Sequence, residues 1–133
     1  MRNSSEASRR KPLSELEALA MRFLWSNGPA TADQLRTGVA PQHPMKDATV
    51  RTVLRRLEEK GYVSHRVEGR TFIYSGVERP ENVAAGAIRQ LLDIFCGGSV
   101  EQLLIGMVDH EVITTHELTE LARKINRRGK ERD

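Results

Sequence analysis

The sequence has little of the features that mark secreted, membrane or disulfide-bonded proteins. It contains one cysteine, Cys96, which excludes an intrachain disulfide and is expected to pack as a small hydrophobic side chain. No apolar run approaches the roughly 18 residues that a membrane span requires, and the N-terminus lacks the apolar segment of a signal peptide. We therefore expect a soluble, cytoplasmic protein with no membrane insertion.

Motifs for catalysis and for cofactor binding are also missing. There is no Gly-x-Ser-x-Gly, no phosphate-binding loop and no His-Glu-x-x-His, because His116-Glu117 lacks a second histidine at the required spacing. A catalytic site would require the four scattered histidines to converge: His43, His65, His110 and His116. His110 and His116 are expected to be solvated loop and cap residues rather than metal ligands. The sequence therefore predicts no enzyme, no cofactor and no metal site.

The charge of the chain is small overall but unevenly distributed. The 133 residues carry a net charge of +3. Residues 1–80 hold 14 Lys and Arg against 9 Asp and Glu, residues 81–122 hold 1 against 7, and residues 123–133 hold 6 against 2. A basic first part and an acidic second part indicate two modules with different partners.

An amphipathic helix is predicted over Ala48 to Lys60. Four apolar residues recur at helical spacing on one stripe: Val50, Val53, Leu54 and Leu57. The opposite face carries Arg51, Thr52, Arg55, Arg56 and Glu59. Arginine binds phosphates and is the commonest side chain that reads guanine in the major groove, so this face is a candidate for DNA recognition. The alternative is a solvated face on which Glu58 and Glu59 pair with Arg55 and Lys60.

A β-hairpin is predicted to follow this helix over Tyr62 to Tyr74. Gly61 is suited to end the helix because glycine enters the left-handed region at little cost. Alternating and β-branched residues indicate two strands, with Glu68 and Gly69 in the turn. Arg66 and Arg70 are then expected on a projecting basic loop. Basic residues on both elements favour DNA binding over the solvated face.

Two capped helices are predicted before this pair. Ser14 with Glu17, and Thr31 with Gln34, match the capping box that begins a helix. Asp47 is the expected N-cap of the third helix. The series predicts a winged helix-turn-helix over residues 13–76, preceded by a flexible basic arm over residues 1–12.

Residues 80–127 are predicted to form three short helices, followed by a basic tail over residues 128–133. Their apolar faces are too small for an independent core without metal or disulfides, so a second copy of the chain is the expected partner. The expected dimerisation residues are Ile88, Leu91, Leu92, Phe95, Leu103, Leu104, Met107, Leu118, Leu121 and Ile125. The alternative is that these helices fold back on their own winged helix.

The motifs between residues 49 and 74 carry a family resemblance. The run Thr49-Val50-Arg51-Thr52-Val53-Leu54-Arg55-Arg56-Leu57, then Lys60-Gly61-Tyr62-Val63 and Glu68-Gly69-Arg70, resembles the penicillinase-repressor (BlaI/MecI) family, whose wider group includes copper-responsive CopY-type regulators. The resemblance extends from about Leu13 to Ile125. It implies a homodimeric transcriptional repressor with a winged helix, a C-terminal dimerisation region and a palindromic double-stranded DNA operator.

The resemblance also implies particular sites. The family's operator contacts fall here on Thr49, Arg51 and Thr52, and Arg70 falls in its wing. A membrane sensor-protease often relieves repression in this family by cutting between an Asn and a Phe. That position holds Gly106-Met107 here, which is the candidate cleavage region. The copper branch carries a cysteine cluster, which Cys96 alone cannot supply.

The expected fold class is therefore mainly α with a small β-hairpin, a winged helix-turn-helix plus a C-terminal helical dimerisation region. The expected DNA-binding residues are Thr49, Arg51, Thr52, Arg55, Arg56, Arg66 and Arg70. The competing hypothesis is a winged-helix module that binds other proteins and does not read DNA sequence.

Overall fold

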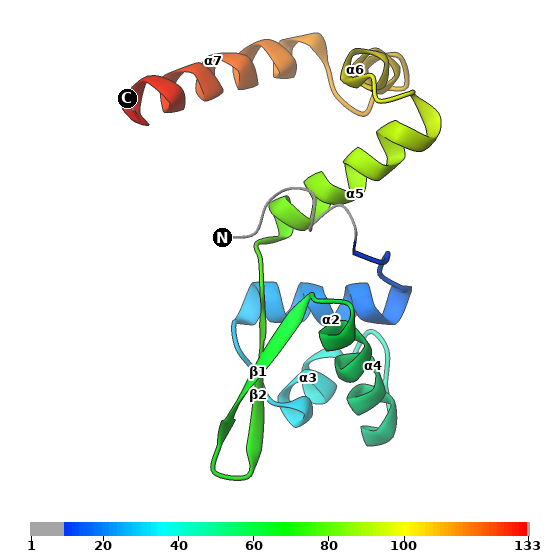
Figure 1. The fold of residues 1–133 in the computed structure, drawn as a ribbon, viewed down its shortest axis with the longest axis vertical. Coiled ribbons are helices and arrows are strands. Elements are labelled where there is room, and N and C mark those ends of the chain that lie inside the picture. Colours follow the sequence, from blue (N-terminus) through cyan, green and yellow to red (C-terminus); the bar gives the residue numbers. More distant parts are fainter. Residues whose placement is uncertain (1–9, 133) are drawn as a thin grey trace. The chain divides into compact units, whose positions relative to one another are not determined.

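The computed structural model describes residues 10–132, which fall into two compact units divided between Ile88 and Arg89. The first unit contains α2 (Glu15–Asn27), α3 (Ala32–Val39), α4 (Asp47–Glu59), β1 (Val63–Glu68), β2 (Thr71–Gly76) and the start of α5 (Pro80–Phe95). The second contains the rest of α5, α6 (Val100–Asp109) and α7 (Thr115–Arg132) (Figure 1). The predicted fold class, helical with one antiparallel hairpin, is confirmed.

Local side-chain caps begin four of the helices, and two of these caps, at Ser14 and Thr31, are the predicted capping boxes. The Ser14 hydroxyl accepts a hydrogen bond from the Glu17 amide at 3.2 Å, and the Glu17 carboxylate accepts one from the Ser14 amide at 2.8 Å. Thr31 forms the same box at the start of α3. Ser99 and Thr114 accept from backbone amides of α6 and α7. Each cap satisfies amides that the helix itself leaves unpaired.

The core of the first unit lies between α2, α3, α4 and the start of β1. The predicted stripe of α4 is fully buried in it, with Val50, Leu54 and Leu57 at 0% exposure. The other buried apolar residues of this core are Ala20, Met21, Leu24, Ala30, Ala32, Leu35, Val39, Val53, Tyr62 and Val63. Burying one face of α4 fixes which side chains its other face presents to solvent.

The start of α4 differs from the prediction by one residue. Lys46 is the N-cap and makes no side-chain capping bond, whereas Asp47 is already inside the helix. Asp47 instead accepts a hydrogen bond from Arg51 Nε at 2.9 Å, one helical turn later. A carboxylate in the first turn is favourable because the N-terminal end of a helix carries partial positive charge.

The hairpin also differs in register from the prediction. Glu68 pairs with Thr71, so the two-residue turn is Gly69-Arg70 and not Glu68-Gly69. Gly69 has a φ of 63°, in the left-handed region that two-residue hairpin turns require. Arg66 lies within β1 opposite Ile73, so it is not part of the projecting loop.

The two ends of the described chain are more ordered than the sequence suggests. Residues 1–9 of the predicted arm lie outside the described residues, but the Arg10 guanidinium bonds the Glu78 carboxylate at 2.8 Å, and the Lys11 carbonyl accepts from the Tyr62 hydroxyl. The predicted tail is helical to Arg132, because Lys, Arg and Glu favour helix and Gly129 alone does not end it. Residues 10–12 are therefore a packed strap.

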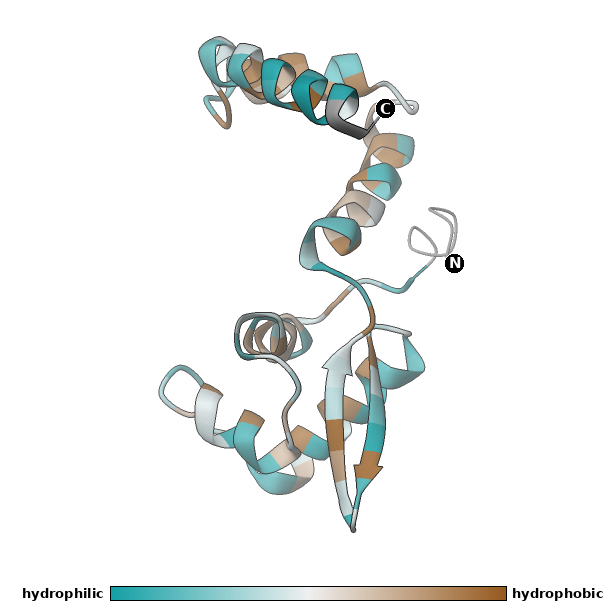
Figure 2. Cartoon of the chain, turned by 90° about the vertical axis from the view of Figure 1, so that its left-hand side faces the viewer, coloured by the Kyte–Doolittle hydropathy of each residue, from teal (hydrophilic) through white to brown (hydrophobic). Residues whose placement is uncertain are grey.

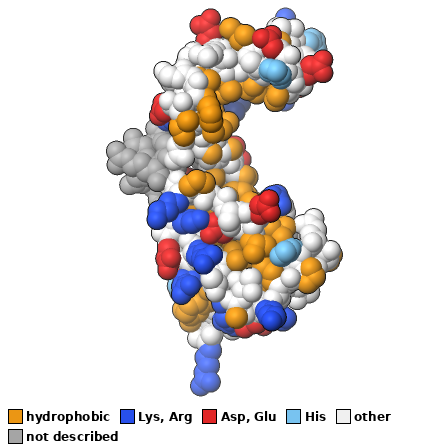
Figure 3. All heavy atoms as spheres, turned by 90° about the vertical axis from the view of Figure 1, so that its right-hand side faces the viewer, with side chains coloured by type: hydrophobic (Ala, Val, Ile, Leu, Met, Phe, Trp, Pro, Cys, Tyr) orange, Lys and Arg blue, Asp and Glu red, His pale blue; other side chains and the backbone are white. Residues whose placement is uncertain are grey.

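The second unit has almost no core of its own. Among the residues described there, Leu92 alone is a buried hydrophobic, at 6% exposure, and α6 buries no residue fully. Phe95 is 74% exposed. Figure 2 shows apolar residues (brown) along these helices, and Figure 3 shows hydrophobic side chains (orange) at their surface.

No single helix within residues 10–132 is long and apolar enough to span a bilayer. The helices α5 and α6 reach the required length and composition only as a pair, and the chain bends by 95° between them.

A close approach of α2 and α3 depends on Gly38. A Cβ at this position would lie 2.0 Å from Phe23 Cε2, whereas one at Gly129 of α7 would meet nothing within 4 Å. Alanine is the better helix former by about 1 kcal/mol, but overpacking costs about 1–3 kcal/mol. We expect Gly38→Ala to lower the free energy of unfolding of the first unit, as measured by urea unfolding. Gly129→Ala, in α7 of the second unit, should leave the stability of the first unit unchanged. A Gly38→Ala variant as stable as the parent would contradict this packing.

Candidate nucleic-acid interface

The face of α4 opposite the core presents three arginines to solvent. Arg51, Arg55 and Arg56 are exposed, while Thr49 and Thr52 are half-buried at the edge of the stripe. The Thr52 hydroxyl donates to the Ala48 carbonyl at 3.0 Å and keeps its oxygen lone pairs available. All five predicted residues of this helix therefore reach its surface.

These arginines are only weakly engaged within the chain. Arg51 pairs with Asp47 at 2.9 Å, and that hydrogen bond raises the pKa of Arg51, which is charged at any working pH. Arg55 lies 4.0 Å from Glu59, and both side chains are 67% exposed. Arg56 has no ion-pair partner among residues 10–132. Exposed pairs of this kind contribute little to stability, so the charges remain available to a ligand.

The solvated-face alternative predicted different partners for the acidic residues of α4. The Glu58 carboxylate bonds His65 Nδ1 of β1 at 2.7 Å, and Lys60 pairs with Glu17 of α2. Of the pairings expected under that alternative, the long Arg55–Glu59 contact alone is present in the described part of the chain. Glu58 thus attaches α4 to the wing, and Lys60 attaches the end of α4 to α2.

The hairpin projects beyond the helices of the first unit and carries Arg70 in its turn (Figure 1). Arg66 points to the opposite side of the hairpin from His65, because successive strand residues alternate between faces. Arg66 also pairs with Glu68 at 3.1 Å. The structure therefore separates the two predicted wing arginines.

Arg51 and Arg70 both line a hollow of about 240 Å³ between α4, the wing and the start of α3. Its lining residues are Thr31, Ala32, Asp33, Arg51, Arg70, Thr71, Phe72 and Tyr74. Two guanidinium groups beside the N-terminal end of a helix favour an anion, and the Asp33 carboxylate in the same lining offsets part of that positive charge. The sequence analysis did not assign Thr31, Phe72 or Tyr74 to this site, although the capping box at Thr31 located the helix end that lines it.

Backbone pairing holds the wing against the helices. The Ala30 amide donates to the Tyr74 carbonyl at 2.9 Å, and the Tyr74 amide donates to the Ala30 carbonyl at 2.8 Å. This bridge joins the chain just before α3 to the second strand of the hairpin. It explains how residues 31–33 come to line the same hollow as Arg70.

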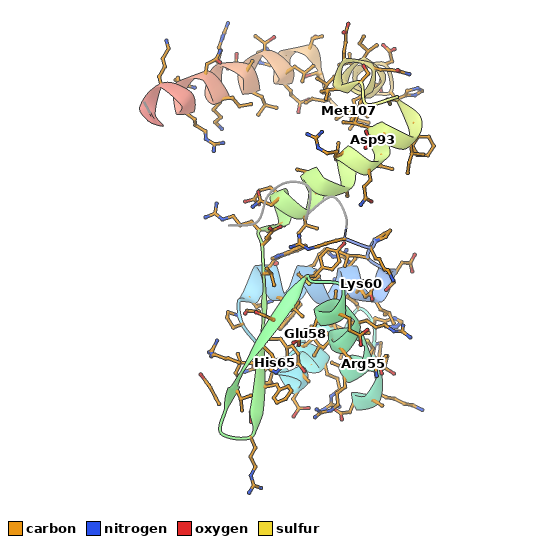
Figure 4. The ribbon with its side chains drawn as sticks, in the orientation of Figure 1. Arg55, Glu58, Lys60, His65, Asp93 and Met107 are labelled. Carbon is orange, nitrogen blue, oxygen red and sulfur yellow. The ribbon has the colours of Figure 1, made fainter. Side chains whose placement is uncertain are left out.

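A cluster of rings fixes the hairpin on α4. The His65 ring stacks on Phe72 with 4.2 Å between centroids and an angle of 10°, and Tyr74 lies 5.7 Å from His65. Glu58 reaches the same imidazole from α4 (Figure 4). Burial raises the pKa of Tyr74, and the negative charge of the nearby Glu58 raises it further. The wing is therefore attached to α4 through side chains as well as through Gly61.

A buried ion pair also fixes the C-terminal end of α4. Lys60 Nζ lies 2.6 Å from Glu17 Oε1, with the Glu17 side chain 3% exposed. Burial alone would raise the pKa of Glu17, but the Lys60 ammonium and the Ser14 hydrogen bonds outweigh it and lower that pKa. Glu17 is therefore ionised, and it joins the first turn of α2 to the end of the arginine-bearing helix.

Helices α3 and α4, with a two-stranded wing after them, define a winged helix-turn-helix protein, and the outer face of α4 is basic. Residues 13–127 match the penicillinase repressor family, and the chain belongs to this family of DNA-binding transcriptional repressors, a non-enzymatic class. The resemblance noted in the sequence is confirmed.

Known relatives cover most of the chain at low identity. The penicillinase repressor of Bacillus licheniformis is 21% identical over 110 residues, 82% of this chain and 85% of that protein. The methicillin resistance regulatory protein MecI of Staphylococcus aureus strain N315 is 21% identical over 116 residues, 87% and 94% of the two chains. The solution structure of monomeric Bacillus licheniformis BlaI with the blaP half-operator is 23% identical, covers 56% of this chain and 90% of that chain, and has a TM-score of 0.48.

Proposed function

We propose that the protein is a dimeric repressor that reads a near-palindromic operator through α4 and the wing. The convergence of Arg51 and Arg70 on one hollow carries this proposal, because two elements then present cations to the same stretch of duplex. Arg is also the side chain best suited to guanine edges. One half-site would be bound by one copy of this surface.

We expect the DNA-binding residues to fall into two groups, those that contact base edges and those that contact phosphates. Thr49, Arg51 and Thr52 lie in the first half of α4, the part that usually reaches base edges in helix-turn-helix proteins. Arg55 and Arg56 follow in the second half, where phosphates are the expected ligands. Arg70 in the wing turn and Arg66 on the other face of the hairpin would contact the backbone beside the reading helix.

Dimerisation is proposed from the incomplete core of the second unit. Of the ten predicted residues, Ile88, Leu91, Phe95, Leu121 and Ile125 are exposed, whereas Leu103, Leu104, Met107 and Leu118 are half-buried. Leu92 is already buried within its own chain, so it is not available to contact a partner. The sequence analysis missed Ile94, Ile105 and Val112, which are more than half exposed. A two-fold dimer would place two α4 helices in major grooves about 34 Å apart.

The dimer can be tested through α7. Ile125 is 61% exposed. A two-fold interface contains each residue twice, so one substitution removes two Ile125 side chains from the dimer. We expect Ile125→Ala to weaken dimerisation by about 2 kcal/mol, measured by sedimentation equilibrium, since each lost side chain contributes roughly 1 kcal/mol of burial. The neighbouring exposed Asn126→Ala is the control and should have no effect. Equal dimer stability in both variants would exclude this face from the interface.

Release by a membrane sensor-protease would require opening of α6. Gly106 and Met107 are half-buried inside that helix. Proteases bind extended chain, so cleavage there needs local unfolding first. We expect a chain nicked at this bond to lose operator affinity by separating α5 from α7, as measured by gel shift. Undiminished affinity of the nicked chain would rule out this route of derepression.

The experiment that tests the proposed function is a footprint of the purified protein on genomic fragments, including its own upstream region. Excess random DNA at physiological salt removes binding that depends on phosphates alone. A protected near-palindrome is the expected result. Binding that is weak, uniform and sensitive to salt would instead favour a protein-interaction module.

A further inference from the structure

The segment between the wing and α5 is attached to the first unit by three contacts. The Val77 amide donates to the Tyr62 carbonyl at 2.9 Å. The Trp25 indole donates to the Glu78 carbonyl at 2.9 Å. The Arg10 guanidinium donates to the Glu78 carboxylate at 2.8 Å. Three separate parts of the chain therefore hold two consecutive residues just before α5 begins.

Arg10 is placed for this contact by its own surroundings. Its guanidinium lies 5.7 Å from the centroid of the Tyr62 ring, and the Tyr62 hydroxyl donates to the carbonyl of Lys11. Lys60 Nζ donates to the Pro12 carbonyl at 3.0 Å. The strap of residues 10–12 is thus fixed to the end of α4 and the start of β1.

The Arg10–Glu78 pair is shielded from solvent, unlike most ion pairs of the chain. Its side chains are 7% and 16% exposed, whereas those of Arg51–Asp47 are 64% and 52% exposed. Charges that are screened little by water interact more strongly. The pair lies at the edge of the hydrophobic core, because the Arg10 guanidinium is next to the ring of Tyr62, a core residue.

The first turns of α5 extend this attachment. Val83 packs against the core of the first unit, and Gly86 is buried. The same helix continues past Ile88 into the second unit. The start of α5 is therefore attached to the first unit both through residues 77 and 78 and through its own first turns.

We propose that Arg10 is a positioning residue that latches Glu78 to the DNA-binding unit and thereby sets the operator spacing the dimer accepts. The inference rests on the proposed function, because spacing has meaning only for a dimer on two half-sites. A loose connection at residues 77–80 would let each winged helix reach half-sites at several separations. A latched connection restricts binding to separations near one helical turn.

The test uses the full-length protein and a series of operators whose spacers differ by single base pairs. The variants are Arg10→Gln, Glu78→Gln and the exchanged pair Arg10→Glu with Glu78→Arg. Lys11→Gln is the matched control, since Lys11 is exposed and its backbone carbonyl makes the contact. Exchange of the Val77 amide without DNA reports how firmly this segment is attached, because that amide donates to the Tyr62 carbonyl, and the Leu54 amide is the internal reference for global stability.

We expect both single variants to lose roughly tenfold in discrimination between optimal and altered spacers, the ratio expected for one charge-assisted hydrogen bond. Affinity for a single half-site should stay constant, and exchange of the Val77 amide should become faster. The exchanged pair should restore both the spacing preference and the slow exchange. Lys11→Gln should keep the spacing preference. Arg10→Gln removes a positive charge and Glu78→Gln removes a negative one. The same loss of spacing preference in both variants would therefore not be an effect of net charge on DNA binding.

Three results would overturn the latch. Opposite effects of Arg10→Gln and Glu78→Gln would make Arg10 a phosphate contact. Equal losses on every operator, with faster exchange at Leu54, would make the pair merely structural. An unchanged spacing profile would remove its role in specificity even if exchange rises. A parent protein that protects no operator would refute the proposed function, and the spacing claim with it.

Discussion

Replacing Lys60 by methionine is expected to destabilise the first unit by about 3 kcal/mol. The substitution keeps the apolar stem but leaves the Glu17 carboxylate, which is 3% exposed, without its ammonium partner. Removing one partner of a buried pair costs about 3–5 kcal/mol, and the 22% exposure of Lys60 places the effect at the lower end. Urea unfolding followed by circular dichroism measures the change.

The effect should depend on pH in a defined direction. Burial opposes ionisation of Glu17, but Lys60 and Ser14 lower its pKa in the folded chain. The stabilisation is therefore fully present above the unfolded pKa of about 4.3 and is lost as the pH falls through the lower folded value. Because the unfolded pKa is the same in both proteins, the difference between parent and Lys60→Met depends only on the folded pKa of Glu17, which is higher without Lys60. The difference should narrow as the pH falls from the pKa of Glu17 in the variant to its lower pKa in the parent.

A double variant separates the ion pair from other roles of Lys60. Adding Glu17→Gln to Lys60→Met removes the uncompensated charge while keeping the shape of the side chain, so stability should partly recover. The capping box is retained, because glutamine also accepts the Ser14 amide hydrogen bond. A double variant less stable than Lys60→Met alone would show that Glu17 does not depend on Lys60.

Replacing Arg51 by glutamine is expected to weaken operator binding by roughly 10- to 100-fold while changing affinity for random DNA much less. Arg51 Nε is bonded to Asp47, which orients the guanidinium and leaves its two terminal nitrogens available to a guanine edge. Competition gel shifts with operator and random duplex measure both affinities. Stability should be unaffected, since the side chain is 64% exposed.

Arg22→Gln is the control for Arg51→Gln, because it changes the charge of the protein by the same amount. Arg22 is an exposed residue of α2, an element that does not line the hollow. It should retain operator discrimination. Equal losses for Arg51→Gln on operator and random DNA, with a salt slope reduced by about 1, would assign Arg51 to a phosphate rather than a base.

The comparison of sequence and structure is clearest at the helix termini and in the wing. The capping boxes at Ser14 and Thr31 and the stripe from Val50 to Leu57 are where the sequence predicts them. The hairpin turn moved by one residue, because Gly69 is compatible with more than one turn register until strand pairing selects one. Arg66 consequently lies in a strand rather than in the turn.

The sequence by itself determined the elements, the buried face of α4 and the family, because capping and periodicity depend on residues three or four positions apart. Only the tertiary structure decided which side chains meet. Lys60 reaches Glu17 across 43 positions and Arg10 reaches Glu78 across 68. Such pairs depend on how packed elements are placed in space, which no local pattern encodes, and the hollow shared by Arg51 and Arg70 arises in the same way.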